Sequence, residues 1–265
     1  MSANGLVRVG RAARLALHIV YALVLVALIL IPARLTGQVR GRRIRDRLVQ
    51  HWFSGLGRRL GLRILLEGHP ATGRALRVAN HISWLDIVAL NAVAPSRFVA
   101  KAEVASWPLI GWMAGWLGTL FLRRGDVRSS QRLIEAMGWQ LRRDETLTLF
   151  PEGTTGNGES LGKFHARMYQ SALLTRAPVQ PVAIAYPHPL GDRSTHPLAP
   201  FVGEQTLTAH VWALLGARDL VVRVAFLPPL SSTETCRQHL VGQSRDAIAL
   251  RLGLAAEMAK AKIAG

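Results

Sequence analysis

The first quarter of the sequence contains almost no acidic residues and no lysine. Residues 1–63 hold twelve arginines against one acid, Asp46, and so carry +11 of the formal net charge of +17. Cysteine is nearly absent too: Cys236 stands alone, which excludes an internal disulfide and agrees with a reducing compartment. Repeats and low-complexity segments are not evident, and 49% of the residues are hydrophobic. The chain is therefore no disordered polymer, and its 265 residues suffice to bury one substantial core.

An apolar run, Leu15–Ile31, contains seventeen residues without a charge between Arg14 and Arg34. At about 1.5 Å per residue, a helix of this length reaches about 25 Å, slightly less than the roughly 30 Å hydrocarbon core of a bilayer. Either the flanking arginines snorkel and the helix spans, or the helix lies in one leaflet. No small-x-small pattern follows the run, so an uncleaved anchor is favoured over a cleaved signal peptide.

The basic surplus fits an anionic membrane surface or a nucleic acid. The adjacent apolar run decides for the membrane, and we expect no nucleic-acid partner. Six arginines follow the run closely and three precede it, so a spanning helix would place the rest of the chain on the cytoplasmic side of the inner membrane. Residues 40–60 predict a basic amphipathic helix, seated beside the anchor or packed on the globular part. We therefore expect residues 1–60 to form a membrane anchor and a basic amphipathic helix.

From Leu62 onward, short apolar runs alternate with stretches of helical periodicity. This alternation predicts one α/β domain over residues 61–265, with a mostly parallel central sheet flanked by helices. The expected strands cover residues 62–66, 75–79, 97–100, 119–122, 146–150, 179–185 and 220–226. The expected helices cover residues 84–93, 104–116, 127–142, 163–175 and 239–263. The stretch 187–203, rich in proline and glycine, is expected to be a surface loop.

A first polar cluster, Asn80–Asp86, directly follows the expected strand 75–79. An aspartate that accepts a hydrogen bond from one imidazole nitrogen fixes the histidine tautomer and raises the basicity of the other nitrogen, which suits His81 and Asp86. Ser83 and Asp86 also match a capping box, with Ser83 as the N-cap of the next helix. The two interpretations are compatible, because Asp86 then lies in the first turn, near the loop that carries His81.

A second cluster, Phe150–Gly158, follows the expected strand 146–150. It combines a carboxylate, two hydroxyls and three glycines, which suits a tight turn facing a ligand. A plain surface turn is the alternative. Both clusters follow strands, and open α/β sheets present their sites at the carboxyl ends of strands.

These blocks resemble the glycerolipid acyltransferases of the 1-acylglycerol-3-phosphate acyltransferase type. That family carries, in order, NHxxxxD, K-x-E…P-x-x-G, G-x-[IL]-F-[IL]-x-R and FPEGT blocks and an apolar strand with a proline. The matching residues here are Asn80–Asp86, Lys101–Glu103 with Pro108 and Gly111, Gly118–Arg124, Phe150–Thr154 and Val179–Ile184. The five ordered matches cover roughly residues 75–185, and their joint occurrence is far more specific than any single motif.

The resemblance implies the chemistry. His81 would be the general base and Asp86 its orienting partner, as a fatty acyl group moves from acyl carrier protein or coenzyme A to a lysolipid hydroxyl. The transfer would be direct, without an acyl-enzyme, a bound cofactor or a metal. The implied partners are membrane lipids and the thioester carrier.

The resemblance also implies a substrate-binding set. Lys101 and Arg124 would hold the polar head of the acceptor, and Glu152, Gly153 and Thr154 would shape its pocket. The family members that form phosphatidic acid usually carry arginine directly after EGT, where this chain has Thr155. An arginine at that position would supply a bidentate phosphate contact. Lysophosphatidate, giving phosphatidic acid, and lyso-ornithine lipid therefore both remain as acceptors, with Lys163, His165 and Arg167 as compensating cations in the first case.

Two rival interpretations belong to other classes. Gly158–Gly162 satisfies G-x-S-x-G, so Ser160 would be the nucleophile of a serine hydrolase with Asp219 and His239. That motif requires a strand immediately before it and a helix immediately after it. A non-catalytic membrane-surface protein would explain the arginine-rich first quarter but would leave the five ordered blocks unexplained.

Overall fold

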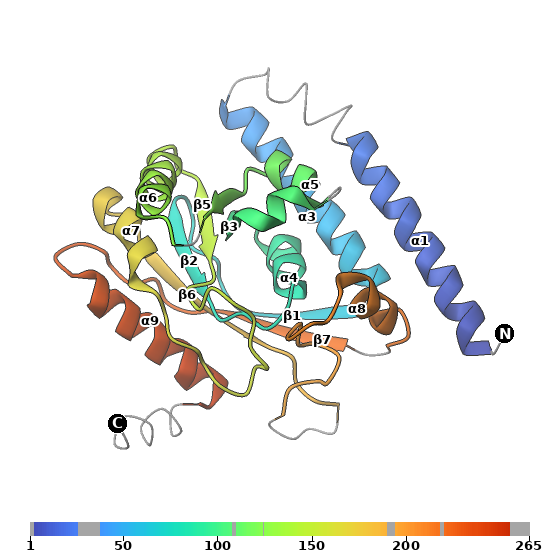
Figure 1. Cartoon of the computed structure of the whole chain (residues 1–265). Helices are drawn as coiled ribbons and strands as arrows, with labels where there is room; N and C mark the ends of the chain where they lie inside the picture. Colours follow the sequence, from blue (N-terminus) through green and yellow to red (C-terminus); the bar gives the residue numbers. More distant parts are fainter. Residues whose placement is uncertain are drawn as a thin grey trace. The chain divides into compact units, whose positions relative to one another are not determined.

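The computed structural model (Figure 1) describes residues 3–25, 38–107, 110–123, 125–189, 194–217 and 220–254. These residues form two compact units that alternate along the chain. The first unit is built from the described parts of Met1–Leu65, Ile82–Pro95 and Tyr186–Arg223, and the second from those of Leu66–His81, Ser96–Ala185 and Val224–Gly265. A functional division into residues 1–60 and 61–265 stays a prediction.

In the described part of the chain, seven strands form a sheet with the order β1-β7-β6-β2-β5-β3-β4. The pairings β2–β5, β2–β6, β3–β5 and β3–β4 are all parallel. The strands are β1 (Leu62–Gly68), β2 (Ala75–Ala79), β3 (Arg97–Lys101), β4 (Leu120–Leu122), β5 (Thr146–Leu149), β6 (Val179–Ala185) and β7 (Leu220–Phe226). The central strands β2 and β6 are buried almost throughout, as expected for strands covered on both faces. The predicted mostly parallel α/β sheet is confirmed.

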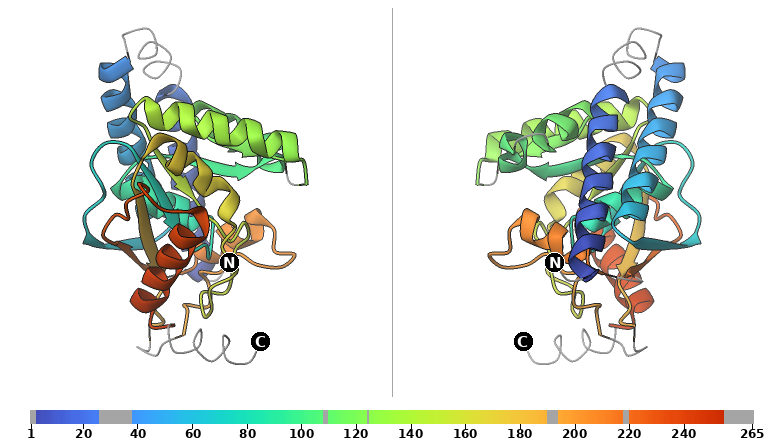
Figure 2. Two further views of the ribbon diagram at one scale, coloured as in Figure 1. Left: turned by 90° about the vertical axis from the view of Figure 1, so that its left-hand side faces the viewer. Right: turned by 90° about the vertical axis from the view of Figure 1, so that its right-hand side faces the viewer.

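The second unit holds most of this sheet and an apolar core around its central strands. Its helical elements are η2 (Ala102–Ser106), α5 (Ile110–Trp116), α6 (Val127–Arg142), η3 (Ala166–Tyr169), α7 (Gln170–Thr175) and α9 (Arg237–Leu252). Asp126 is the N-cap of helix α6, and its side chain accepts the Arg128 N–H at 2.8 Å. Its apolar positions Leu133, Met137 and Leu141 then recur at helical spacing and join the core around the central strands. Helix α9 packs along β6 and η3 (Figure 2).

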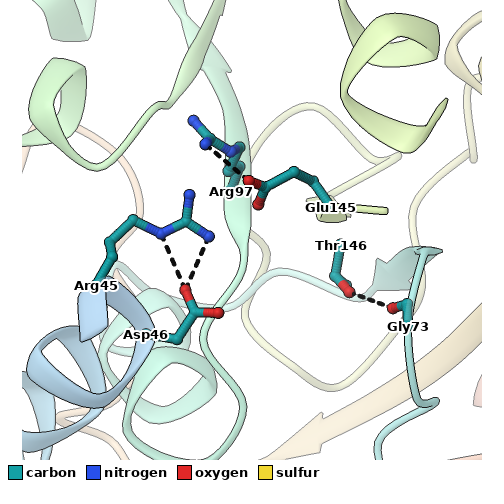
Figure 3. Close-up of polar contacts among 6 residues, drawn as sticks. All are labelled: Arg45, Asp46, Gly73, Arg97, Glu145 and Thr146. Atoms are coloured by element: carbon teal, nitrogen blue, oxygen red, sulfur yellow. Dashed lines mark hydrogen bonds and ion pairs between the residues drawn. The ribbon is translucent and has the colours of Figure 1, made fainter. Parts of the chain in front are cut away.

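A largely buried ion pair fixes where two parallel neighbours of this sheet begin. Arg97 opens β3, and its Nη2 lies 3.0 Å from a carboxylate oxygen of Glu145, the residue before β5. Next to it, the Thr146 hydroxyl donates to the Gly73 carbonyl at 2.9 Å (Figure 3). Breaking such a pair leaves an uncompensated buried charge, so these contacts hold the register of β2, β5 and β3.

Three predicted helices differ from the structure. The stretch 104–116 is divided into η2 and α5, which approach so closely that a Cβ on Gly111 would lie 2.1 Å from the Ala105 carbonyl oxygen. Residues 163–165 precede the helical segment instead of starting it. Helix α9 ends at Leu252 because Gly253, with a φ of 75°, takes the left-handed C-cap position, and residues 255–265 lie outside the described residues.

The first unit contains four helices in its described residues: α1 (Ala3–Leu25), α3 (Gln38–Arg59), α4 (Leu85–Val93) and α8 (Leu207–Leu214). Helix α3 packs against both α1 and α4 (Figure 1). The expected helix 40–60 is confirmed as α3, whereas α8 was not predicted. The α3–α4 contact supports the packed interpretation of this amphipathic helix.

A buried histidine joins α1 to α3. His18 Nε2 lies 2.9 Å from the Trp52 carbonyl oxygen, and the Trp52 indole N–H donates to the His18 carbonyl at 3.1 Å. The two rings stack with centroids 5.3 Å apart. Gly55 makes room for the imidazole, because a Cβ there would lie 2.7 Å from His18 Cε1. Burial lowers the pKa of His18, and the positive charge of Arg59 lowers it further, so the neutral imidazole is the form that fits.

Helix α1 exposes much of its apolar surface. It starts at Ala3, well before the predicted anchor, and residues 26–31 of that anchor lie outside the described residues. No helix among the described residues is long and apolar enough to cross a membrane. Among the side chains that the structure describes on α1, the large apolar ones that are exposed are Val7, Val9, Leu17, Val20, Tyr21, Leu23 and Val24.

Candidate active site

His81 follows the central strand β2, and the residue before it anchors the loop. The Asn80 amide donates to the Ile184 carbonyl at 2.9 Å, and its Oδ1 accepts the Ile184 N–H at 2.8 Å. Asn80 is 2% exposed, so this reciprocal pair replaces the strand pairing that stops at Ala79. The chain can therefore leave the sheet at His81 without losing buried backbone hydrogen bonds.

The backbone and the ring of His81 are held by the second polar cluster. Its N–H donates to Glu152 Oε1 at 2.9 Å, and its carbonyl accepts the Gly156 N–H at 2.8 Å. Its imidazole stacks on Phe150, with centroids 3.8 Å apart and planes 10° from parallel. Phe150 is buried, whereas His81 remains partly exposed. One face of a fixed imidazole is thus covered, while the residue keeps some access to solvent.

Glu152 links this loop to the end of its own turn. Its Oε2 accepts the Gly162 N–H at 2.7 Å, so the carboxylate binds two backbone donors that are far apart in sequence. Charge-assisted bonds of this kind are about twice as strong as neutral ones. Gly153, with a φ of 69°, closes the tight turn through a bond from its N–H to the Phe150 carbonyl. The sequence did not reveal this positioning role of Glu152, and the acceptor-pocket role of Glu152, Gly153 and Thr154 stays a prediction.

Asp86 belongs to the first unit and is 0% exposed. Its Oδ2 accepts the backbone N–H groups of Ile82 at 2.7 Å and Ser83 at 2.9 Å, and its Oδ1 accepts the Tyr186 hydroxyl at 2.7 Å. Burial, reinforced by the Asp86 charge, raises the pKa of Tyr186 well above its ordinary value, so the phenol stays protonated and donates. The sequence reasoning missed Tyr186, which no motif distinguishes from an ordinary core tyrosine.

The expected N-cap of helix α4 is wrong by one residue. Asp86 lies in the first turn as predicted, but the N-cap is Trp84, without a side-chain cap bond. The Ser83 N–H nevertheless donates to the Asp86 carboxylate, which is the half of a capping box that the predicted pattern assigns to residue 86. The Ser83 hydroxyl is buried and has no hydrogen-bond partner among the described residues.

Of the two predicted basic contacts, Lys101 lies on β3, two strands from β2 in the sheet order. Lys101 is the exposed last residue of β3, and Arg124 lies outside the described residues. Lys101 is in register with Leu122, two residues before Arg124 in the chain. Beside this strand pair lies an open groove of about 530 Å³, lined by apolar side chains, two arginines, one aspartate and one serine: Ala102, Leu120, Phe121, Leu133, Ala136, Arg123, Arg132, Asp126 and Ser129.

The surroundings of Ser160 and the arrangement of the His, Cys and acidic side chains bear on the other chemistries. Among the residues that the structure describes, no group of three or more His, Cys, Asp or Glu side chains is placed to hold a metal ion. Ser160 is exposed, β5 ends at Leu149 and the next helical residue is Ala166, so the strand–turn–helix context of a nucleophile elbow is missing. Asp219 lies outside the described residues.

Comparison with known proteins supports the resemblance carried by the motifs. The sequence model of the family described as Acyltransferase matches residues 64–185. A lyso-ornithine lipid O-acyltransferase of Pseudomonas aeruginosa is 42% identical over 212 residues, which are 79% of this chain and 80% of that protein. A 1-acyl-sn-glycerol-3-phosphate acyltransferase of Neisseria meningitidis is 37% identical over 185 residues, 68% of this chain and 71% of that protein. The crystal structure of the 1-acyl-sn-glycerophosphate acyltransferase PlsC from Thermotoga maritima shares the fold, with a TM-score of 0.66 at 20% identity over 93% of this chain and 96% of that one. The chain belongs to the glycerolipid acyltransferase family.

Proposed function

We propose that this acyltransferase moves a fatty acyl group from an acyl carrier protein or coenzyme A thioester directly to the free hydroxyl of a lysolipid, with His81 as the general base. The observation that carries the proposal is the way in which the backbone and the ring of His81 are held in place. Its backbone is hydrogen-bonded at both N–H and C=O, and its ring is stacked on Phe150. An imidazole held in one orientation is what efficient proton transfer requires.

The transfer needs one proton carrier and one leaving group. His81 takes the proton of the acceptor hydroxyl while its oxygen attacks the thioester carbonyl carbon. The tetrahedral intermediate collapses, the C–S bond breaks, and the imidazolium returns the proton to the leaving thiolate. Asp86 acts on His81 as its orienting partner. Its hydrogen bonds from the backbone N–H groups of Ile82 and Ser83 also hold the loop that follows the base. No acyl-enzyme, bound cofactor or metal takes part.

For the acceptor, we favour lyso-ornithine lipid over lysophosphatidate. Two observations support this choice: Thr155 stands where the family's phosphatidic-acid-forming members usually carry arginine, and the relative with 42% identity is a lyso-ornithine lipid O-acyltransferase. A zwitterionic amino-acid head group demands less positive charge from the protein than a phosphate does. Lys101 and Arg124 then supply the head-group contacts, and Glu152, Gly153 and Thr154 shape the pocket.

We place the enzyme on the cytoplasmic face of the inner membrane, seated through its N-terminal helices. The exposed apolar side chains of α1 and the arginines of residues 1–63 support this location. Apolar surface combined with cationic side chains is typical of helices that bind an anionic bilayer.

The test is acyl transfer by the purified full-length protein in detergent, with each acceptor offered alongside each thioester. His81→Ala is expected to lower turnover by about 10²–10⁴-fold, the usual contribution of a general base. His239→Ala, at an exposed position of α9, and Ser160→Ala should both retain full activity. Full activity of His81→Ala, or no acylation of either acceptor, would contradict the proposal.

The acceptor has its own test. If the missing guanidinium sets the preference, Thr155→Arg should shift the ratio of kcat/KM values toward lysophosphatidate, by about tenfold for one charge-assisted contact. Asn157→Arg, two residues later at an exposed position, is the matched control. An unchanged or reduced preference for lysophosphatidate would show that Thr155 does not select the acceptor.

A further inference from the structure

A segment beyond the family blocks holds the loop that follows His81. The Phe201 N–H donates to the Ile82 carbonyl at 3.0 Å. Two residues further on, the Trp84 indole N–H donates to Nδ1 of His210 at 3.0 Å. All these residues lie in the first unit, and residues 198–210 are outside the stretch 64–185 that matches the family.

Both nitrogens of His210 are used, which fixes its tautomer. Nε2 lies 2.8 Å from the Leu198 carbonyl oxygen. A carbonyl oxygen can only accept, so Nε2 carries the hydrogen and Nδ1 offers its lone pair to Trp84. The imidazole therefore relays one continuous chain of hydrogen bonds from the Trp84 side chain to the backbone of the 194–206 segment.

The position of the His210 ring is further determined by packing. His210 is 1% exposed and stacks on Phe201, with centroids 5.4 Å apart and planes 14° from parallel. Trp84 meets it edge-on, with an interplanar angle of 88°. A side chain with no rotational freedom presents its acceptor nitrogen in one place, which is the property required of a residue that orients another.

We propose that His210 is a positioning residue for acyl transfer: through Trp84 it fixes the loop 82–84 and, with it, the adjoining His81. This inference rests on the proposed function of His81 as the base. Ile82 is covalently joined to His81, so looseness at residues 82–84 spreads the imidazole over several positions. A misplacement of about 1 Å at a reacting group can lower turnover by about 10²-fold. Since His210 is buried and contacts no substrate in this scheme, the effect falls on kcat and leaves KM for donor and acceptor nearly unchanged.

The experiment measures kcat and KM for three single variants, for the double variant that combines Trp84→Phe with His210→Leu, and for one control. Trp84→Phe removes only the indole N–H, and His210→Leu removes the acceptor while keeping an apolar side chain. We expect each to lower kcat about tenfold, and the double variant to lose little more than either one, because both act through the same bond. His210→Asn should recover much of the loss, since its Oδ1 can accept the indole N–H where Nδ1 did. Trp212→Phe, an exposed tryptophan on the same helix α8, is the control and should behave as wild type.

Thermal unfolding of each variant confirms that folded protein is compared. If His210→Leu does not fold, the kcat values of Trp84→Phe and His210→Asn still test whether His210 positions the loop. A normal kcat in Trp84→Phe, fully additive losses in the double variant, or a rise in KM without a fall in kcat would each overturn the proposal. The proposed function is tested separately: an inactive His81→Ala with a fully active His210→Leu would overturn only the role of His210.

Discussion

The two ends of the block Asn80–Asp86 are held by different parts of the chain. His81 lies in the second unit, where the Phe150–Gly158 cluster supplies its backbone bonds and its stacking partner. Asp86 lies in the first unit, where its side chain accepts the hydroxyl of Tyr186, a hundred residues away. A single short motif is therefore fixed by two frameworks, of which only one consists of recognisable motif residues.

The two frameworks also differ in chemistry. On the His81 side the charge belongs to Glu152, which is partly exposed and orients backbone groups. On the Asp86 side the charged carboxylate is fully buried and accepts three hydrogen bonds. A buried carboxylate depends on each of its donors, because desolvation is costly unless it is offset. The Asp86 side should therefore be the more sensitive to substitution.

The largest effect is expected for Asp86→Asn. The amide oxygen can still accept the two backbone N–H groups, and the NH₂ group then donates to the Tyr186 oxygen, so the direction of the Tyr186 bond is reversed. The orienting charge for His81 disappears as well, and we expect kcat to fall by about 10³-fold or more. The measurement is the turnover number at saturating acceptor, and Asp246→Asn, exposed on α9, is the matched control. A variant that stays folded with more than a tenth of wild-type turnover would contradict the role of Asp86.

A smaller loss is expected for Glu152→Gln. The glutamine oxygen can still accept the His81 N–H, but its NH₂ group then faces the Gly162 N–H and cannot accept from it. We expect kcat to fall about ten- to a hundredfold through displacement of the His81 loop. Glu159→Gln, an exposed acid of the same segment, should have no effect on turnover. If KM for the acceptor rises instead while kcat is unchanged, Glu152 acts mainly as a pocket residue.

Tyr186→Phe tests the remote partner alone. It removes the hydroxyl that donates to Asp86 and leaves the ring in the core, where Tyr186 is 1% exposed. Hydrogen bonds to charged groups contribute about 1.5–3 kcal/mol, so the free energy of unfolding should fall by that amount while kcat falls only a few-fold. Urea denaturation and steady-state kinetics measure the two quantities. A loss of kcat as large as that of Asp86→Asn would mean that Tyr186 takes part in the chemistry itself.

The features predicted correctly from the sequence are those with a local signal, either a periodic apolar pattern or a short motif. Strand periodicity located all seven strands, and helix α6 starts and ends at its predicted residues because Asp126 caps a regular apolar stripe. The residues of both polar clusters were also identified, since they form ordered blocks. At Ser83 the local pattern predicted the backbone bond to Asp86 correctly, but the Ser83 hydroxyl has no partner among the described residues and Trp84 is the N-cap.

Other features lay beyond any local pattern. Tyr186 and His210 are ordinary residue types at unremarkable spacing, and only the fold brings them to Asp86 and Trp84. The division of 104–116, by contrast, had a local signal that the prediction overlooked: Trp107, directly before Pro108, is extended with a ψ of 125°. Helix α8 was missed because its eight residues are too few to show a clear period.

The smallest effect on turnover is expected far from the block, at His18 between α1 and α3. The folded state lowers the pKa of His18 below its value of 6.5 in the unfolded chain, chiefly through burial. The unfolded chain therefore binds more protons as the pH falls through 6.5, so the contact is stable at neutral pH and weakens toward pH 5. Hydrogen exchange of α1 amides should accelerate over that interval beyond the intrinsic rate change, whereas His18→Gln should lose this extra dependence.

Gly55→Ala should weaken the same contact at every pH, because its Cβ would meet the imidazole. If detergent-assayed kcat stays constant in both variants while α1 loosens, the N-terminal contact serves membrane seating and leaves the Asp86 framework to serve catalysis. A fall in kcat that parallels the rise in the exchange rates would instead mean that the contact between α1 and α3 also supports catalysis.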